Sequence, residues 1–298
     1  MTIKNKILIL ALLLSTLFID DASAQFYNGS QLNFGKNRVQ HDADRFWTYF
    51  RYDAFDTYYY LGGRDYAIYT ARYAMQAIPD IEERLDYKFE SKVQFVIFNS
   101  LSDLKESNIG LLSNEQYNIG GVTYIVGTKV FIYFDGDYAN LEQQIRLGLA
   151  QVILNEMLYG AQITSQVKNS TLIHLPSWYT QGLISWLSDD WSVGIDNRVR
   201  DAVISGRYEN FNGLEGQEAI YAGHSIWKYI SDKYGMSTIS NIVYMTKVSR
   251  QVENGFLFVV GLSFKSLVNE WQQFYKEEFY SSESFRNGVS GEPFPAKQ

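Results

Sequence analysis

The clearest pattern in the chain is a run of apolar residues at helical spacing over residues 141–159. It predicts a helix with one broad buried stripe. The stripe consists of Ile145, Leu149, Val152, Ile153 and Met157. Gly160 follows where a helix commonly ends, and a polar stretch fills 161–171. Pro176 then stands where its missing N–H costs nothing, so the pattern predicts a second helix over 176–187.

Strand patterns precede these two helices. Aromatic and β-branched residues predict one or two strands within 47–60 and another strand at 92–99. Two further apolar runs, 121–126 and 129–134, flank Gly127 and are expected to form an antiparallel pair. The first half of the chain is therefore expected to contain a small sheet.

Helical patterns fill most of the remaining chain. A long helix is expected at 65–85, where Pro79 predicts a kink or a break near Ile78. The other expected helical segments are 100–107, 196–205, 219–234, 237–246, 252–260 and 263–279. Strands first and helices afterwards indicate an α+β fold, with a small mixed or antiparallel sheet followed by a helical half.

The N-terminus has the pattern of a secretory signal over residues 1–24. Lys4 and Lys6 precede an apolar stretch at 7–19, and Ala-Ser-Ala at 22–24 is typical of a cleavage site. No later segment reaches the roughly 18 apolar residues that a membrane-spanning helix needs. We expect an exported, periplasmic or envelope-associated protein without a transmembrane segment in its mature chain.

Composition narrows the expected partners. The chain has no cysteine, which excludes a disulfide framework and a lipid-modified cysteine. The formal net charge of −7 argues against nucleic acid as a partner. We divide the chain into the signal, a leader with a strand at 25–54, a main domain at 55–280 and a polar tail at 281–298.

One motif on the second helix resembles a known family. Residues 175–182 read LPSWYTQG, which is similar to the L-P-x-W-[FY]-x-E-G pattern of peptidase MA-like domains. These domains are the gluzincin branch of the HExxH zinc peptidases. The order of strands and helices over about 55–279 is also similar to theirs. The resemblance implies a zincin-like architecture.

The same resemblance places a zinc site on residues that do not bind zinc. In HExxH peptidases two histidines hold the metal, the glutamate between them activates water, and gluzincins add a glutamate from the second helix. Aligned with this pattern, Leu147 and Gln151 take the histidine positions and Gly148 takes the position of the base. Gln181 takes the position of the third ligand. The resemblance therefore implies a pseudo-peptidase without a metal or other cofactor.

The resemblance also implies a binding cleft between the two helices. Its candidate residues are Gln144, Gln151, His174, Gln181, Tyr221 and His224. Ordinary alternatives exist for two of them: His174 as a polar loop residue and His224 as a hydrogen-bonded helix residue. We also expect segments 53–60 and 130–134 to be sheet edges to which a peptide can add as a strand. The alternative is that the two segments are ordinary amphipathic helices of a helical core and do not form a binding cleft related to that of a peptidase.

Three functions remain open from the sequence. We favour an exported, non-catalytic domain that binds a protein or peptide in the cell envelope. The second is an active, metallopeptidase-like hydrolase with a relocated site, although the sequence has no cysteine and no G-x-S-x-G motif. The third is a structural domain. The leader FGKNRVQ at 34–40 is similar to Gram-negative envelope proteins in which such a domain precedes a TolB-like propeller, and no propeller repeat occurs in this sequence.

Overall fold

The computed structural model describes residues 45–107, 109, 125–161 and 173–288 of the chain. The expected signal at 1–24, most of the expected leader, and the strand residues expected at 121–124 lie outside these ranges. So does most of the polar stretch between the two central helices.

The described strands form one mixed sheet in the order β1-β2-β3-β5-β4. β1 pairs antiparallel with β2, the pairs β2–β3 and β3–β5 are parallel, and β4 pairs antiparallel with β5. The strands are β1 (Thr48–Arg51), β2 (Phe55–Tyr59), β3 (Val93–Phe98), β4 (Ile125–Val126) and β5 (Lys129–Tyr133). The expected mixed sheet is confirmed. β1 belongs to this sheet although it lies in the segment expected to be a leader.

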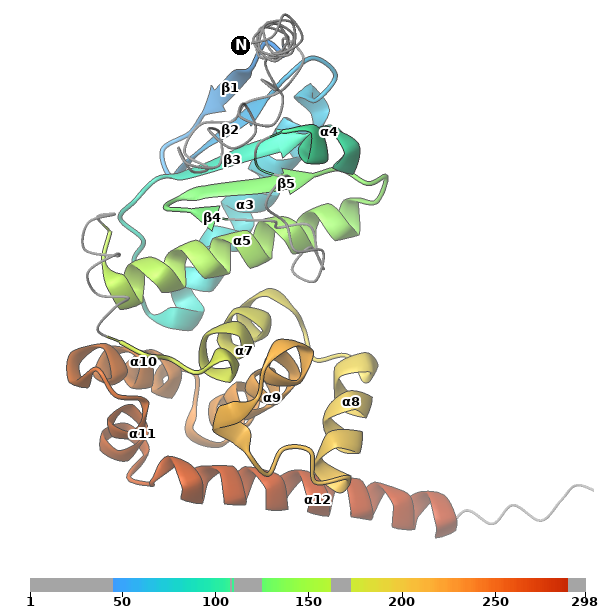
Figure 1. Ribbon diagram of the computed structural model, residues 1–298, viewed down its shortest axis with the longest axis vertical. Helices are drawn as coiled ribbons and strands as arrows, with labels where there is room; N and C mark the ends of the chain where they lie inside the picture. The colour runs from blue at the N-terminus through green and yellow to red at the C-terminus, as the bar shows by residue number, and fades with distance from the viewer. Residues whose placement is uncertain (1–44, 108, 110–124, 162–172, 289–298) are drawn as a thin grey trace, which may run out of the picture.

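Two long helices, α3 and α5, cover one face of the sheet, and the later helices form a separate half below them in Figure 1. This order confirms the α+β class. The helices are α3 (Arg64–Leu85), α4 (Leu101–Glu106), α5 (Tyr138–Tyr159), α7 (Ser177–Ser188), α8 (Val193–Ile204), α9 (Gly216–Tyr234), α10 (Ser237–Ser249), α11 (Val252–Val260) and α12 (Phe264–Gly288), with a 3-10 turn η5 (Phe211–Gly213).

One hydrophobic core joins the sheet to the helical half. It runs from β3 and β5 through α3 and α5 into α7, α9 and α10. A second, smaller cluster lies on the opposite face of the sheet under α4, and it contains Phe98, Leu104 and Phe131. Because α5 contributes to the large core along most of its length, this helix connects the two halves of the molecule.

Two details differ from the sequence expectations. α3 continues through Pro79 as one helix, so of the expected kink or break, the break does not occur. Ile78 and Ile81 are buried on either side of the proline and hold both parts of the helix against the core. At the other end of the chain, α12 continues to Gly288, beyond the expected end of the last helix. Within the described ranges, no helix combines the length and apolar character that crossing a membrane requires.

Candidate functional site

α5 lies between the sheet and α7 and is bound to both (Figure 1). On the α7 side, Arg146 Nε donates to the carbonyl of Leu187 at 2.8 Å. Gln143 Nε2 donates to Asp189 Oδ1 at 3.0 Å. The two helices that carry the motif positions are therefore neighbours, and hydrogen bonds as well as apolar contacts fix them together.

Gly148, which the sequence resemblance aligns with a general base, has no room for a side chain. A Cβ built on Gly148 would lie well under 3.0 Å from Val130 Cγ1 on β5, closer than Cβ contacts in real proteins come. Val130 is itself fully buried and β-branched, so it has little freedom to move aside. Glycine at position 148 thus permits close contact between α5 and the sheet. A carboxylate at this position would displace β5.

The three positions expected for metal ligands are less tightly enclosed than Gly148. Leu147, Gln151 and Gln181 are each half-buried. Neither glutamine side chain has a hydrogen-bond partner among the described residues. Within the same part of the chain, no group of three His, Cys, Asp or Glu side chains is placed to hold a metal ion. A leucine and two neutral amides offer zinc no strong ligand.

Gln144 does not line a cleft, and its expected role is wrong. It is 2% exposed, and its side-chain amide bonds both backbone groups of one strand residue. Gln144 Oε1 accepts from the N–H of Tyr133, and Nε2 donates to the carbonyl of Tyr133, each at 3.0 Å. The amide therefore occupies the place that another strand would take beside β5.

The expected sheet edges are also wrong. β2 lies between β1 and β3, so a peptide cannot add to it. On β5, β4 pairs with Lys129 and Val130, and Gln144 caps Tyr133 farther along. The sheet order could not be read from the strand sequences, because β2 and β3 are joined by a parallel crossover through α3 and β3 pairs with β5, which is not the next strand in the chain. In the described sheet, the long open edge is β1.

His224 is a buried residue of the interface between α7 and α9. This confirms the alternative that it is a hydrogen-bonded helix residue. It is 1% exposed, and its Nδ1 lies 2.9 Å from Ser185 Oγ on α7. The Trp191 ring packs against the imidazole, with ring centres 5.6 Å apart. Burial, reinforced by the nearby charge of Lys228, lowers the pKa of His224 to about 4, and Asp190 opposes this shift. The imidazole is therefore neutral at ordinary pH.

The two remaining cleft candidates do not meet His224. Tyr221 is half-buried on α9, and the guanidinium of Arg198 lies 5.1 Å from its ring centre. His174 is exposed, as expected for a polar loop residue before α7. Among the described residues, no two of the six cleft candidates share a hydrogen bond. Hydrogen bonds among the described residues therefore do not link these candidates into one polar network.

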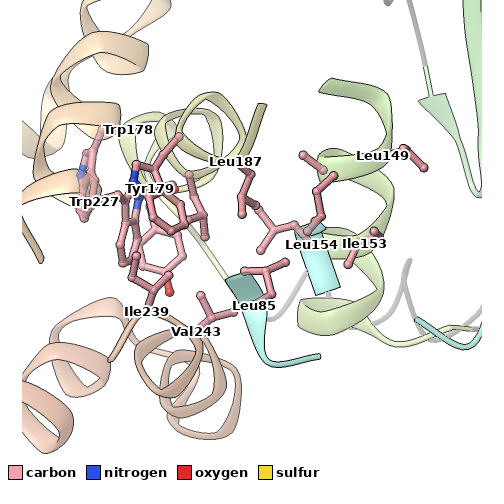
Figure 2. Packing of buried hydrophobic residues seen from close by; sticks show 14 of the residues in the cluster. Leu85, Leu149, Ile153, Leu154, Trp178, Tyr179, Leu187, Trp227, Ile239 and Val243 are labelled. Atoms are coloured by element: carbon pink, nitrogen blue, oxygen red, sulfur yellow. Dashed lines mark hydrogen bonds between the residues drawn. The ribbon is translucent and has the colours of Figure 1, made fainter. Parts of the chain in front are cut away.

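The LPSWYTQG motif instead builds the core of the helical half. Trp178 and Tyr179 are fully buried, and Figure 2 shows them beside Trp227. The indole of Trp227 donates to the carbonyl of Tyr179 at 3.0 Å, and the indole of Trp178 donates to Asn212 Oδ1 at 3.0 Å. The aromatic pair at the start of α7 therefore belongs to the core.

The glycine of this motif has a packing role. Gly182 on α7 crosses Gly223 on α9 so closely that a Cβ on either one would lie under 3.0 Å from the other helix's backbone. Figure 2 shows the next contact of α7, where Leu187 meets Leu154 of α5 and Leu85 of α3 in one apolar layer. α7 is therefore enclosed by close contacts with α9 on one side and α5 on the other.

Glu156 near the end of α5 is an anchor that the sequence does not reveal. Its carboxylate is 1% exposed and accepts three hydrogen bonds. The donors are the Tyr87 hydroxyl at 3.1 Å, the N–H of Glu90 at 2.8 Å and the N–H of Ser91 at 3.2 Å. This one side chain fixes the connection from α3 to β3. No local pattern predicts it, because its partners lie far away in the sequence.

A pocket of about 480 Å³ lies away from the motif helices. It is formed by the turn between β1 and β2 together with the middle of α3 and Lys88. Its walls are mainly apolar and aromatic, and charged side chains of both signs stand around them. The residues that line it are Arg51, Tyr52, Asp53, Ala54, Phe55, Ala74, Met75, Ile78, Pro79, Glu82 and Lys88. None of the motif positions contributes to this pocket.

No protein-family model matches the chain, and comparison with curated proteins finds no match either.

Proposed function

We propose that this protein is an exported, non-catalytic relative of the gluzincins that binds a protein or peptide of the cell envelope. The proposal rests on the resemblance of LPSWYTQG and the element order to peptidase MA-like domains. It includes the zincin-like architecture, with α5 and α7 as counterparts of the two active-site helices. The adjacency of these helices supports that correspondence.

The single observation that supports loss of catalysis is the contact of Gly148 with Val130. If only a metal-ligand side chain had been replaced, the backbone would still be in the place that a zinc site needs, and one mutation could restore the ligand. Here the space for the base is filled by a buried strand residue, so the backbone position itself is changed. A positioned general base contributes a factor of about 10²–10⁴ in rate, and zinc-activated water adds to that. A protein without both has no means of hydrolysing peptides in the gluzincin manner.

Binding is tested by using the purified protein as bait in envelope extract. Gln151 and Gln181 are the half-exposed motif positions of α5 and α7, so Gln151→Arg with Gln181→Arg should abolish capture of a specific partner without unfolding the protein. Asn197→Arg on the exposed surface of α8 is the matched control and should retain the partner. The captured protein must then bind again as a purified component. Equal capture by both variants would remove the α5–α7 surface from the proposal.

Catalysis is tested separately with an unfolded protein substrate. We expect no cleavage above the background of a mock purification. Cleavage that co-purifies with the protein and disappears in Ser185→Ala would instead favour a hydrolase with a relocated site, because Ser185 and His224 form the one hydroxyl–imidazole pair described above. Both residues are nearly completely buried, which disfavours that function. A structural domain supporting a TolB-like propeller is the remaining alternative, and failure of both assays would favour it.

A further inference from the structure

Among the residues that the structure describes, β1 has no strand partner along one side. The N–H of Tyr52 donates to the carbonyl of Phe55 at 2.9 Å, which makes these two residues a hydrogen-bonded pair across the β1–β2 turn. Bonded and non-bonded pairs alternate along an antiparallel ladder. Phe50 therefore bonds to β2, whereas the N–H and C=O groups of Tyr49 and Arg51 point away from it. In the described part of the chain, no strand pairs with this side of β1.

The pocket lies at the end of this same edge. Tyr52 and Phe55 form its aromatic wall, with ring centres 4.8 Å apart, and Ile78 of α3 lies across from them. Met75 on its rim is 51% exposed and adds apolar surface at the mouth of the pocket. The edge thus offers backbone hydrogen bonds and, immediately beside them, a site for an apolar side chain.

Phe46 is an exposed apolar side chain placed to fill such a pocket. It is 87% exposed and precedes β1 by two residues. By strand alternation it belongs to the same face as Phe50 and Tyr52, which pack toward α3. One strand therefore carries both an exposed aromatic side chain at its start and an apolar pocket at its end.

We propose that β1 pairs antiparallel with β1 of a second copy of this chain, and that Phe46 of each copy enters the pocket of the other. Such an interface is isologous, because the same surface is used twice around a two-fold axis. The inference goes beyond the proposed function and does not depend on it.

The register supports a second copy as the occupant. Outward-pointing residues must pair with outward-pointing residues, and those of β1 (Thr48–Arg51) are Tyr49 and Arg51, so a pairing confined to β1 sets Tyr49 opposite either Tyr49 or Arg51 of the other copy. In the first register Phe46 lies opposite Tyr52, and in the second it lies opposite Ala54. Both of these residues line the pocket. The next register would place Arg51 opposite Arg51, which is unfavourable because the charges are alike.

The inference is tested by measuring mass against concentration by sedimentation equilibrium. A single short strand pair with one anchor at each end is at the small end of interface sizes, so the dimer should dissociate easily. We expect the mass to rise from one chain toward two between roughly 1 µM and 500 µM. A mass of one chain throughout this range overturns the proposal.

Three variants locate the interface. Phe46→Ala removes the anchor and should raise the dimer dissociation constant at least tenfold. Tyr49→Pro removes an outward N–H, a change that edge strands tolerate, and should abolish the dimer while circular dichroism stays that of the wild type. Leu61→Ala is the matched control, because Leu61 is 94% exposed at the end of β2 and off the β1 edge.

The results for these variants show whether a second copy of the chain or another protein binds to the β1 edge. Loss of the dimer in Phe46→Ala and Tyr49→Pro, with Leu61→Ala unchanged, supports the proposal. A dimer that persists in both variants places the interface elsewhere and overturns it. A chain that stays monomeric but loses a captured envelope protein in Tyr49→Pro assigns the β1 edge to another protein's strand. That result also overturns the second copy as occupant, and it leaves the test of the proposed function at Gln151 and Gln181 unaffected.

Discussion

Gly148 on α5 and Val130 on β5 are in such close contact that a methyl group on the glycine would overlap the valine side chain. This contact fixes the distance between α5 and the sheet. It also fills the position that we propose as the counterpart of the general base in gluzincins.

The stability of a Gly148→Ala variant shows whether packing against Val130 or helix propensity has the larger effect at this position. Alanine stabilises the interior of a free helix by about 1 kcal/mol relative to glycine. Overlap with Val130 should reverse that sign, and we expect a net destabilisation of about 1–3 kcal/mol in denaturant titration. Gly194→Ala on α8 is the control, because its added Cβ would meet only Ser192 Oγ at an ordinary 3.7 Å. A Gly148→Ala variant as stable as the wild type contradicts the close contact.

The crossing of Gly182 and Gly223 should tolerate alanine even less. At Gly148 the obstacle is a side chain, whereas here an added Cβ meets backbone atoms of the other helix, which cannot rotate away. We expect Gly182→Ala to destabilise by about 3 kcal/mol or more, at the upper end for overpacking. The thermal midpoint of Gly182→Ala compared with that of Gly148→Ala measures the difference. The reverse ranking would contradict the geometry of α7 and α9.

Glu156 should be one of the most sensitive carboxylates of the protein. Glu156→Ala would leave two part-buried backbone N–H groups and the Tyr87 hydroxyl without their acceptor. An unsatisfied buried donor costs about 1–3 kcal/mol, and these part-buried donors belong at the low end, so we expect a total loss of about 3 kcal/mol in unfolding free energy. Tyr87→Phe removes one of the three donors and should cost only about 1 kcal/mol. Similar losses in the two variants would show that Glu156 acts mainly through another contact.

Stability should fall as pH falls because of His224. Its pKa is lowered to about 4 in the folded protein, from an ordinary value of about 6.5. Between these values the unfolded chain binds a proton that the folded chain does not, so acid favours unfolding. The effect amounts to about 2 kcal/mol between pH 7 and pH 5.

The measurement is the unfolding free energy of the wild type and His224→Gln at both pH values. The variant is expected to be less stable at pH 7, because it disturbs the contact with Ser185, but to lose about 2 kcal/mol less on acidification. Parallel pH profiles would show that the surroundings of the imidazole, including Asp190 and Lys228, leave its pKa near the ordinary value.

The sequence was sufficient to predict the helices that are marked by apolar periodicity and by local start and stop signals. The apolar stripe of α5, the proline before α7 and Gly160 and Gly235 after their helices are local signals, and the structure has these helices where they indicate.

The sequence was not sufficient where a residue's partner lies far along the chain. Gln144 is a polar residue on a helix expected to line a cleft, but its amide binds the backbone of Tyr133. The spacing of residues in the sequence does not reveal this contact. The aromatic segment of β2 was expected to form a sheet edge, but the parallel crossover through α3 places it inside the sheet. The contact of Gly148 with Val130 depends on how closely α5 approaches β5, and only the three-dimensional packing sets that distance.

The most direct test of the gluzincin correspondence restores the metal ligands and leaves position 148 alone. The variant combines Leu147→His, Gln151→His and Gln181→Glu, and zinc uptake is measured by calorimetry on folded protein. The central claim predicts one equivalent of zinc and a higher thermal midpoint with zinc than without, because metal binding stabilises only the folded state. The wild type and a variant lacking the Gln181→Glu change are the controls and should take up less or none. A folded triple variant that binds no zinc would contradict the account, because the three positions would then not converge as they do in a gluzincin.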